Sequence, residues 1–182
     1  CIIMSIIVSK PEFNLRDKLN ELDGKVPYEK MPSGSIIQVA YAQTKTQQSS
    51  TSQSFINATN MFVDISPRFS TSQIIITVHT VAQISGNRAR FDILKTTTNS
   101  VTGGAGLSER ISRHSNDNNQ DYSISAFEGN NINHSVNFTI EDLPGTTDLI
   151  RYQLQFNNTG GSTTYVQGNY SVGTITAMEV KQ

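Results

Sequence analysis

The sequence contains very little cysteine and few charged residues. Cys1 is the only cysteine, so no disulfide can form within the chain. Charged residues make up 16% of the chain and the formal net charge is −1. A protein that binds nucleic acid or membrane surfaces through general electrostatics carries an excess of basic residues, which is missing here. We therefore expect no nucleic acid and no membrane among its partners.

Long apolar runs are also missing. No stretch approaches the ~20 apolar residues that cross a membrane as a helix. The apolar start "CIIMSIIV" is too short for the core of a signal peptide, and it lacks a basic front and a small-residue cleavage site. We therefore expect synthesis in the cytoplasm without export, with Met4 rather than Cys1 as the true start.

Motifs for catalysis or metal binding are lacking as well. There is no G-x-S-x-G elbow, and His79, His114 and His134 do not have the spacing of metal ligands. We expect His79 to be a half-buried strand residue. Carboxylates such as Glu109, Glu141 and Asp142 become a glycosidase pair only if the fold places them suitably. The sequence thus predicts no enzyme, no catalytic or metal-ligating residue and no cofactor.

What the sequence does contain is the composition of β-structure. Serine, threonine, asparagine and glutamine make up more than a third of the residues, which suits strands with one solvated face. Apolar residues alternate with polar ones between loops rich in glycine and asparagine. We predict an all-β fold, an antiparallel β-sandwich of the jelly-roll kind with a short N-terminal α-helical arm. The predicted strands span 35–43, 53–66, 72–85, 88–95, 107–112, 122–127, 134–141, 150–156, 163–167 and 172–180.

The strongest predicted strand is 72–85. Its alternation places Ile74, Ile76 and Val78 on one face, and Ile75 and Val81 on the other. Gly86-Asn87 follows it as a turn signal, which predicts a hairpin into 88–95.

Segment 35–43 has the same period and places Ile37, Val39 and Tyr41 on one side. As an exposed edge it would need cover. Segment 53–66 predicts either two short strands or one bulged strand. The polar stretch 44–54 before it predicts a long surface loop or a solvated strand.

A separate segment precedes the strands, and we predict two domains: a docking arm (1–32) and the sandwich (33–182). Ser9 and Glu12 form a capping box for a helix over about 10–23. Pro27 and Pro32 delimit a semi-rigid linker after it. So short a helix is marginal alone, so its apolar face needs a partner surface, on this chain's own sheet or on other chains. The predicted partner-docking residues are Phe13, Leu15, Leu19 and Leu22.

Several phrases of the sequence resemble virion proteins of phages that infect marine and cyanobacterial hosts. The matching pieces are "MPSGSIIQV", "TKT", the stretch from Val63 to Val78, and the closing "SVGTITAMEV" (171–180). The front, "PEFNLRDKLNELD" (11–23), looks like N-terminal segments of cyanophage tail-fibre and related virion proteins. Residues of about 95–135 have no counterpart in this pattern.

The resemblance implies a tail-fibre or receptor-binding component of the virion, homotrimeric and without a cofactor, whose arm docks on other virion proteins. A capsid decoration or head-fibre protein is the alternative within that class. A carbohydrate-binding module or a polysaccharide-degrading spike enzyme are alternatives outside it. A host surface glycan is a further predicted partner, with Tyr122, Asn130, Asn131 and Tyr165 as candidate contacts.

Overall fold

The computed structural model describes residues 26–86, 88–97, 108–111, 124–126, 132–167 and 171–182. The chain divides into two units, Cys1–Pro32 and Ser33–Gln182. Within the described part of the first unit lies one 3-10 turn, η1 (Tyr28–Lys30), which starts after Pro27 and ends at an extended Met31. The predicted helix over 10–23 lies outside the described residues.

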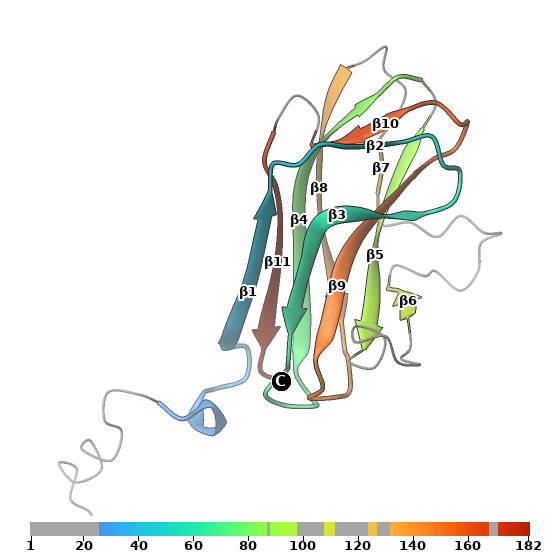
Figure 1. The fold of residues 1–182 in the computed structure, drawn as a ribbon. Coiled ribbons are helices and arrows are strands. Elements are labelled where there is room, and N and C mark those ends of the chain that lie inside the picture. The colour runs from blue at the N-terminus through green and yellow to red at the C-terminus, as the bar shows by residue number, and fades with distance from the viewer. Residues whose placement is uncertain (1–25, 87, 98–107, 112–123, 127–131, 168–170) are drawn as a thin grey trace, which may run out of the picture. The chain divides into compact units, whose positions relative to one another are not determined.

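The second unit is built from two antiparallel sheets that face each other (Figure 1). The first sheet contains β1 (Ile36–Thr44), β2 (Gln48–Ser50), β4 (Gln73–Ile84), β8 (Ile132–Asp142), β10 (Thr164–Val166) and β11 (Gly173–Val180). The second sheet contains β3 (Ile56–Ile65), β5 (Ala89–Thr97), β6 (Ser108–Arg110), β7 (Ile124–Ala126) and β9 (Ile150–Asn158). The predicted all-β antiparallel sandwich is therefore confirmed.

The connections between the long strands pass from one sheet to the other, while the short strands β2, β6, β7 and β10 stay in the sheet of a sequence neighbour. β3 lies in the second sheet, β4 in the first, β5 in the second, β8 in the first and β9 in the second. This alternation is the connection pattern of a jelly roll. The long strands stand in the order β1-β11-β4 with β8 beyond β4 in one sheet, and β3-β9-β5 in the other.

The face assignment of the strongest strand is correct, but the hairpin after it is wrong. In β4 the side chains of Ile74, Ile76 and Val78 are fully buried, whereas Ile75 and Val81 lie on the partly exposed face. β5 does not pair with β4, because it joins β9, β6 and β7 in the opposite sheet. Both sides of β4 are already paired, with β11 and β10 on one side and β8 on the other.

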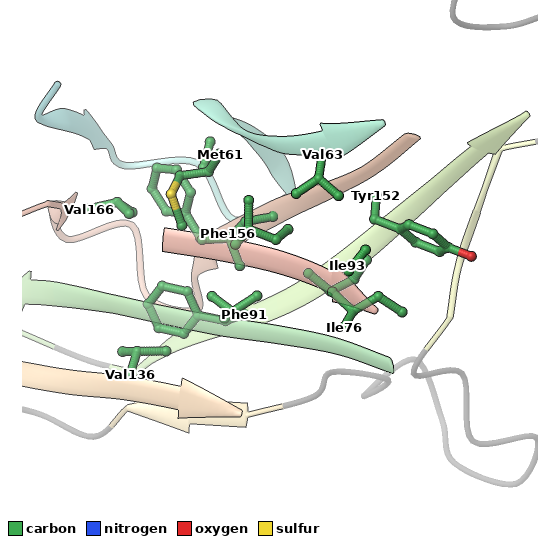
Figure 2. Packing of buried hydrophobic residues seen from close by; sticks show 14 of the residues in the cluster. Met61, Val63, Ile76, Phe91, Ile93, Val136, Tyr152, Phe156 and Val166 are labelled. Atoms are coloured by element: carbon green, nitrogen blue, oxygen red, sulfur yellow. The ribbon is translucent and has the colours of Figure 1, made fainter. Parts of the chain in front are cut away.

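The core lies between the two sheets. Its largest fully buried side chains include Phe91, Phe156, Tyr152 and Met61. Figure 2 shows side chains of both sheets meeting in this layer, with the Tyr152 hydroxyl directed away from the other labelled groups. At ~25 cal/mol per Å² of apolar surface, such burial is the main term that stabilises the fold.

The structure also decides between two alternatives left by the sequence. The predicted segment 53–66 forms one strand, β3, with an irregularity in its pairing to β9 between Asn57 and Phe62. The polar stretch 44–54 contains the short strand β2, which pairs with β10.

Candidate assembly surface

Strand β1 forms one edge of the first sheet. It pairs with β11 along its length, and no described strand pairs with its other side. Proteins protect such edges with lysine, proline or inward-pointing charges, because unpaired N–H and C=O groups invite another chain. The sequence of β1, IIQVAYAQT, contains no charged residue and no proline. Its only protective feature is a register shift between Ile36 and Gln38.

That register shift changes which side chains of β1 face the core. Ile37 is 7% exposed, whereas Val39 and Tyr41 are 56% and 58% exposed. The prediction that these three residues share one face is therefore wrong. A β-bulge inserts one extra residue, and the strict alternation assumed from sequence fails across it.

The outward side chains of β1 continue into an apolar row across the sheet. Val39 lies opposite Met178 of β11, and Met178 lies opposite Ile75 of β4. Direct cross-strand partners point to the same face of a sheet. We define the β1 patch as Ile36, Val39, Tyr41, Ile75 and Met178; Ile36 is itself 53% exposed. The β1 patch is an apolar surface that adjoins a strand edge with which no other described strand pairs.

A buried carboxylate fixes the strand pair beneath this surface. Glu179 of β11 is fully buried, and its Oε1 accepts hydrogen bonds from the Arg68 amide at 2.7 Å and the Ser72 hydroxyl at 2.7 Å. Its Oε2 accepts from Gln38 Nε2 of β1 at 2.7 Å. A buried charge is tolerated only when it is fully hydrogen-bonded, so Glu179 locks β1, β11 and the β3–β4 connection together.

A second charged group ties the two sheets together. Lys95 Nζ of β5 lies 3.1 Å from Asp142 Oδ2 of β8 and 3.3 Å from Glu109 Oε1 of β6. The Tyr152 hydroxyl donates to Asp142 Oδ2 at 2.6 Å. Burial, together with the charge of Asp142, raises the pKa of Tyr152 well above its ordinary value. Tyr152 therefore stays a neutral donor.

The Lys95 group includes two of the carboxylates that the sequence offered as candidates for a glycosidase pair. Glu109 and Asp142 share the ammonium group of Lys95. We interpret the group as a structural tie between the sheets. Among the residues that the structure describes, no three His, Cys, Asp or Glu side chains are grouped to hold a metal ion.

The structure describes only some of the residues that the sequence predicts for partner docking and glycan contact. Phe13, Leu15, Leu19 and Leu22 lie outside the described residues, as do Tyr122, Asn130 and Asn131. Tyr165 lies on β10, where it pairs with Ser49 and Gln83. His79 does lie on a strand, but it is exposed and hydrogen-bonded to Asn137 rather than half-buried.

Sequence reasoning missed Glu179, Ile75 and Met178 as parts of this surface and its support. One signal was present, because Glu179 continues the inward positions of Ile175 and Ala177 along β11. In the described part of the chain, no helix is long and apolar enough to span a membrane.

No family model matches the chain, and no curated protein matches it in sequence. Among solved structures it is similar to structures of infectious bursal disease virus and its particles. The Gx strain structure has a TM-score of 0.40 and 15% identity, covering 80% of this chain and 37% of that one. The VP2 subviral particle gives a TM-score of 0.40, 15% identity and coverage of 81% and 38%. The T13 viral particle has a TM-score of 0.42 and 13% identity, covering 83% of this chain and 37% of that one. The chain thus spans well under half the length of the viral chains that it resembles.

Proposed function

We propose that the chain is a structural protein of a virus particle, assembled in the cytoplasm of the host. The observation that carries this proposal is the β1 patch beside an uncharged strand edge. An isolated soluble domain rarely leaves such a surface open, and an assembling subunit uses it for contact with a neighbour. The neighbour proposed here is a second copy of this chain. Because β1 carries no charge, two copies meet without electrostatic repulsion.

The sequence resemblance also supports a role for the β1–β11 pair in assembly. The two matching phrases at the ends of the sandwich, Met31–Val39 and Ser171–Val180, meet in the β1–β11 pair, where Val39 lies opposite Met178. The phrases that resemble phage virion proteins therefore come together in space.

The finer proposal is a tail-fibre or receptor-binding component of a phage, homotrimeric, displayed outward by an N-terminal arm that docks on other virion proteins. A capsid decoration or head-fibre protein is the alternative, and copy number separates the two. A few to a few dozen subunits per particle favour the tail, whereas hundreds favour the head. A non-catalytic role is part of the proposal, and release of glycan from a host envelope would contradict it.

The proposal is tested by measuring the mass of the full chain in solution with light scattering, for wild type and two variants. Val39→Lys places a charge in the β1 patch, and Asn133→Lys places the same charge on exposed β8 at the other edge of the sheet. We expect wild type and Asn133→Lys to form trimers and Val39→Lys to remain monomeric. Val39→Lys should still fold, because position 39 is exposed, and its melting temperature should match that of wild type at concentrations so low that wild type is itself monomeric.

A wild-type chain that stays monomeric at about 100 µM would contradict self-association through this surface, because subunits of a stable oligomer associate at much lower concentration. An electron-microscopy map of the whole particle then gives the location and the copy number. A chain found in no particle would overturn the virion role itself.

A further inference from the structure

A pocket of 630 Å³ lies on the outer face of the second sheet, away from the β1 patch. Its walls come from β5, β6 and β9 and from the segment before β3, which contributes Phe55. The volume falls within the ~300–1,000 Å³ of small-molecule sites. All of its lining residues except Phe55 and Leu94 are polar or charged. Strand alternation explains this polarity, because Gln155 and Asn157 of β9 point outward while Leu154 and Phe156 fill the core.

The central feature of the pocket is the amide of Asn157, which is 5% exposed. Its Nδ2 donates to the carbonyl oxygen of Gln53 at 2.8 Å, which fixes the orientation of the amide. Its Oδ1 is buried and has no hydrogen-bond partner among the described residues. A buried acceptor without a donor costs about 1–3 kcal/mol, so such an atom calls for an explanation. A ligand that supplies a donor at this point removes the cost.

A second acceptor lies one outward position earlier on the same strand. Gln155 lines the pocket, and its Nε2 donates to Asn57 Oδ1 at 2.8 Å. Its carbonyl oxygen accepts no hydrogen bond from the part of the chain that the structure describes, so it can accept from a ligand. Both amides thus direct their nitrogen atoms to the protein and keep an oxygen for a bound molecule. A ligand of this pocket must therefore carry hydrogen-bond donors, such as hydroxyl groups.

The pocket also offers donors. The guanidinium of Arg110 stacks on the Phe55 ring, with Cζ 4.6 Å from the ring centroid. A guanidinium carries five N–H donors along the edge of its plane, so Arg110 can donate to a ligand in addition to its contacts within the protein. A ligand that both donates to the amide oxygens and accepts from Arg110 is one rich in hydroxyl groups.

The charges around the pocket favour a neutral ligand over an anion. Arg110 Nη1 lies 3.7 Å from Asp92 Oδ2, a carboxylate buried in β5 beneath the pocket. Glu109, the acidic residue of the wall, pairs with Lys95 at 3.3 Å. Because Arg110 already has a carboxylate partner, a phosphate or a carboxylate ligand gains little from contact with its guanidinium.

We propose that this pocket binds a neutral saccharide, held by Gln155 and Asn157 as acceptors and by Arg110 as a donor. The inference does not rest on the virion role, because the pocket lies on a different sheet from the β1 patch and uses different residues. It names a binding site and a ligand class that the receptor-binding role proposed above leaves open.

The test is titration of the full chain, followed by NMR chemical shifts, with a set of neutral saccharides: cellobiose, maltotriose, chitobiose and mannobiose. Sialyllactose and inorganic phosphate serve as the negatively charged probes. We expect at least one neutral saccharide to bind and to shift the side-chain amide signal of Asn157. Phosphate should leave that signal unmoved. Binding of the charged probes alone, or of no probe at all, would overturn the proposal.

Matched variants locate the binding. Gln155→Leu removes one acceptor from the pocket wall, while Gln153→Leu makes the same change two residues away on the same face of β9, outside the pocket. We expect Gln155→Leu to weaken binding about tenfold, as the loss of one hydrogen bond does, and Gln153→Leu to change it less than about twofold. Equal effects of the two substitutions would place the saccharide elsewhere. Val39→Lys should leave saccharide binding unchanged, so failure of the assembly proposal and failure of this one are distinguishable.

Discussion

Glu179 accepts a hydrogen bond from the hydroxyl of Ser72 at 2.7 Å across a separation of 107 residues in the chain. The same carboxylate also accepts from the backbone of the β3–β4 connection and from β1. One acidic group near the end of the last strand therefore organises the pole of the sandwich at which the first strand begins.

Replacing Glu179 with glutamine should destabilise the fold. The carboxylate offers acceptors only, whereas an amide would place an NH₂ group against donors. We expect the free energy of unfolding to fall by about 2–4 kcal/mol, measured by urea denaturation. Glu141→Gln is the control, because that exposed carboxylate contacts the side chain of Gln73. It should change stability by less than about 0.5 kcal/mol. Equal stability of the two variants would show that the hydrogen bonds of Glu179 do not hold β1, β11 and the β3–β4 connection together.

Stability should depend on Tyr152 at high pH. The pKa of Tyr152 is raised in the folded state by burial and by Asp142, so the unfolded chain loses this proton first as the pH rises past about 10. The stabilisation is complete below that pH and is lost above it, by up to about 1.4 kcal/mol per pH unit. Urea denaturation between pH 9 and 12 should show a shallower decline for Tyr152→Phe than for wild type. Parallel curves would contradict the assignment.

The core depends on Phe91, which is fully buried between the sheets (Figure 2). Phe91→Ala should lower the free energy of unfolding by about 3–5 kcal/mol, because the cavity cannot close fully. Leu143→Ala is the matched control, since Leu143 is 71% exposed. It should cost less than about 0.5 kcal/mol. A small effect of Phe91→Ala would mean that the sandwich repacks around the gap.

The docking arm remains a prediction from the sequence. Deletion of residues 4–24 should leave the sandwich with the same melting temperature but prevent its incorporation into particles. Replacing Leu15 and Leu19 with aspartate should have the same effect, because a charge on a buried apolar stripe costs several kcal/mol. Full occupancy of the truncated chain, quantified by mass spectrometry of purified particles, would exclude a docking role for the arm.

The sheet architecture was largely predictable because alternation is a local property. The buried set Ile74, Ile76 and Val78 follows directly from period two, and so does the class of fold. Partner choice is not local. Gly86 marks a chain reversal equally well in a hairpin and in a crossing between sheets, and only packing of the whole core selects between them.

The surfaces were harder to predict than the core. The bulge near Ile36 has no sequence signature, yet it decides whether Val39 faces the core or solvent. The pocket joins residues of β6 and β9 that are more than 40 positions apart, and the unpartnered oxygen of Asn157 is visible only in three dimensions. Long-range geometry of this kind cannot be deduced from residue types alone.

The first and last strands are held together at one pole of the sandwich. Gly34 donates its amide to the Lys181 carbonyl at 2.7 Å, and Lys181 donates to the Ser35 carbonyl at 2.9 Å. Antiparallel ladder bonds lie perpendicular to the strands. A force that pulls Ser33 along the direction of β1 against an anchor at the opposite pole of the sandwich therefore loads the bonds from Ile36 to Thr44 together instead of opening them one after another. Strand β1 is thus a mechanical clamp as well as an edge.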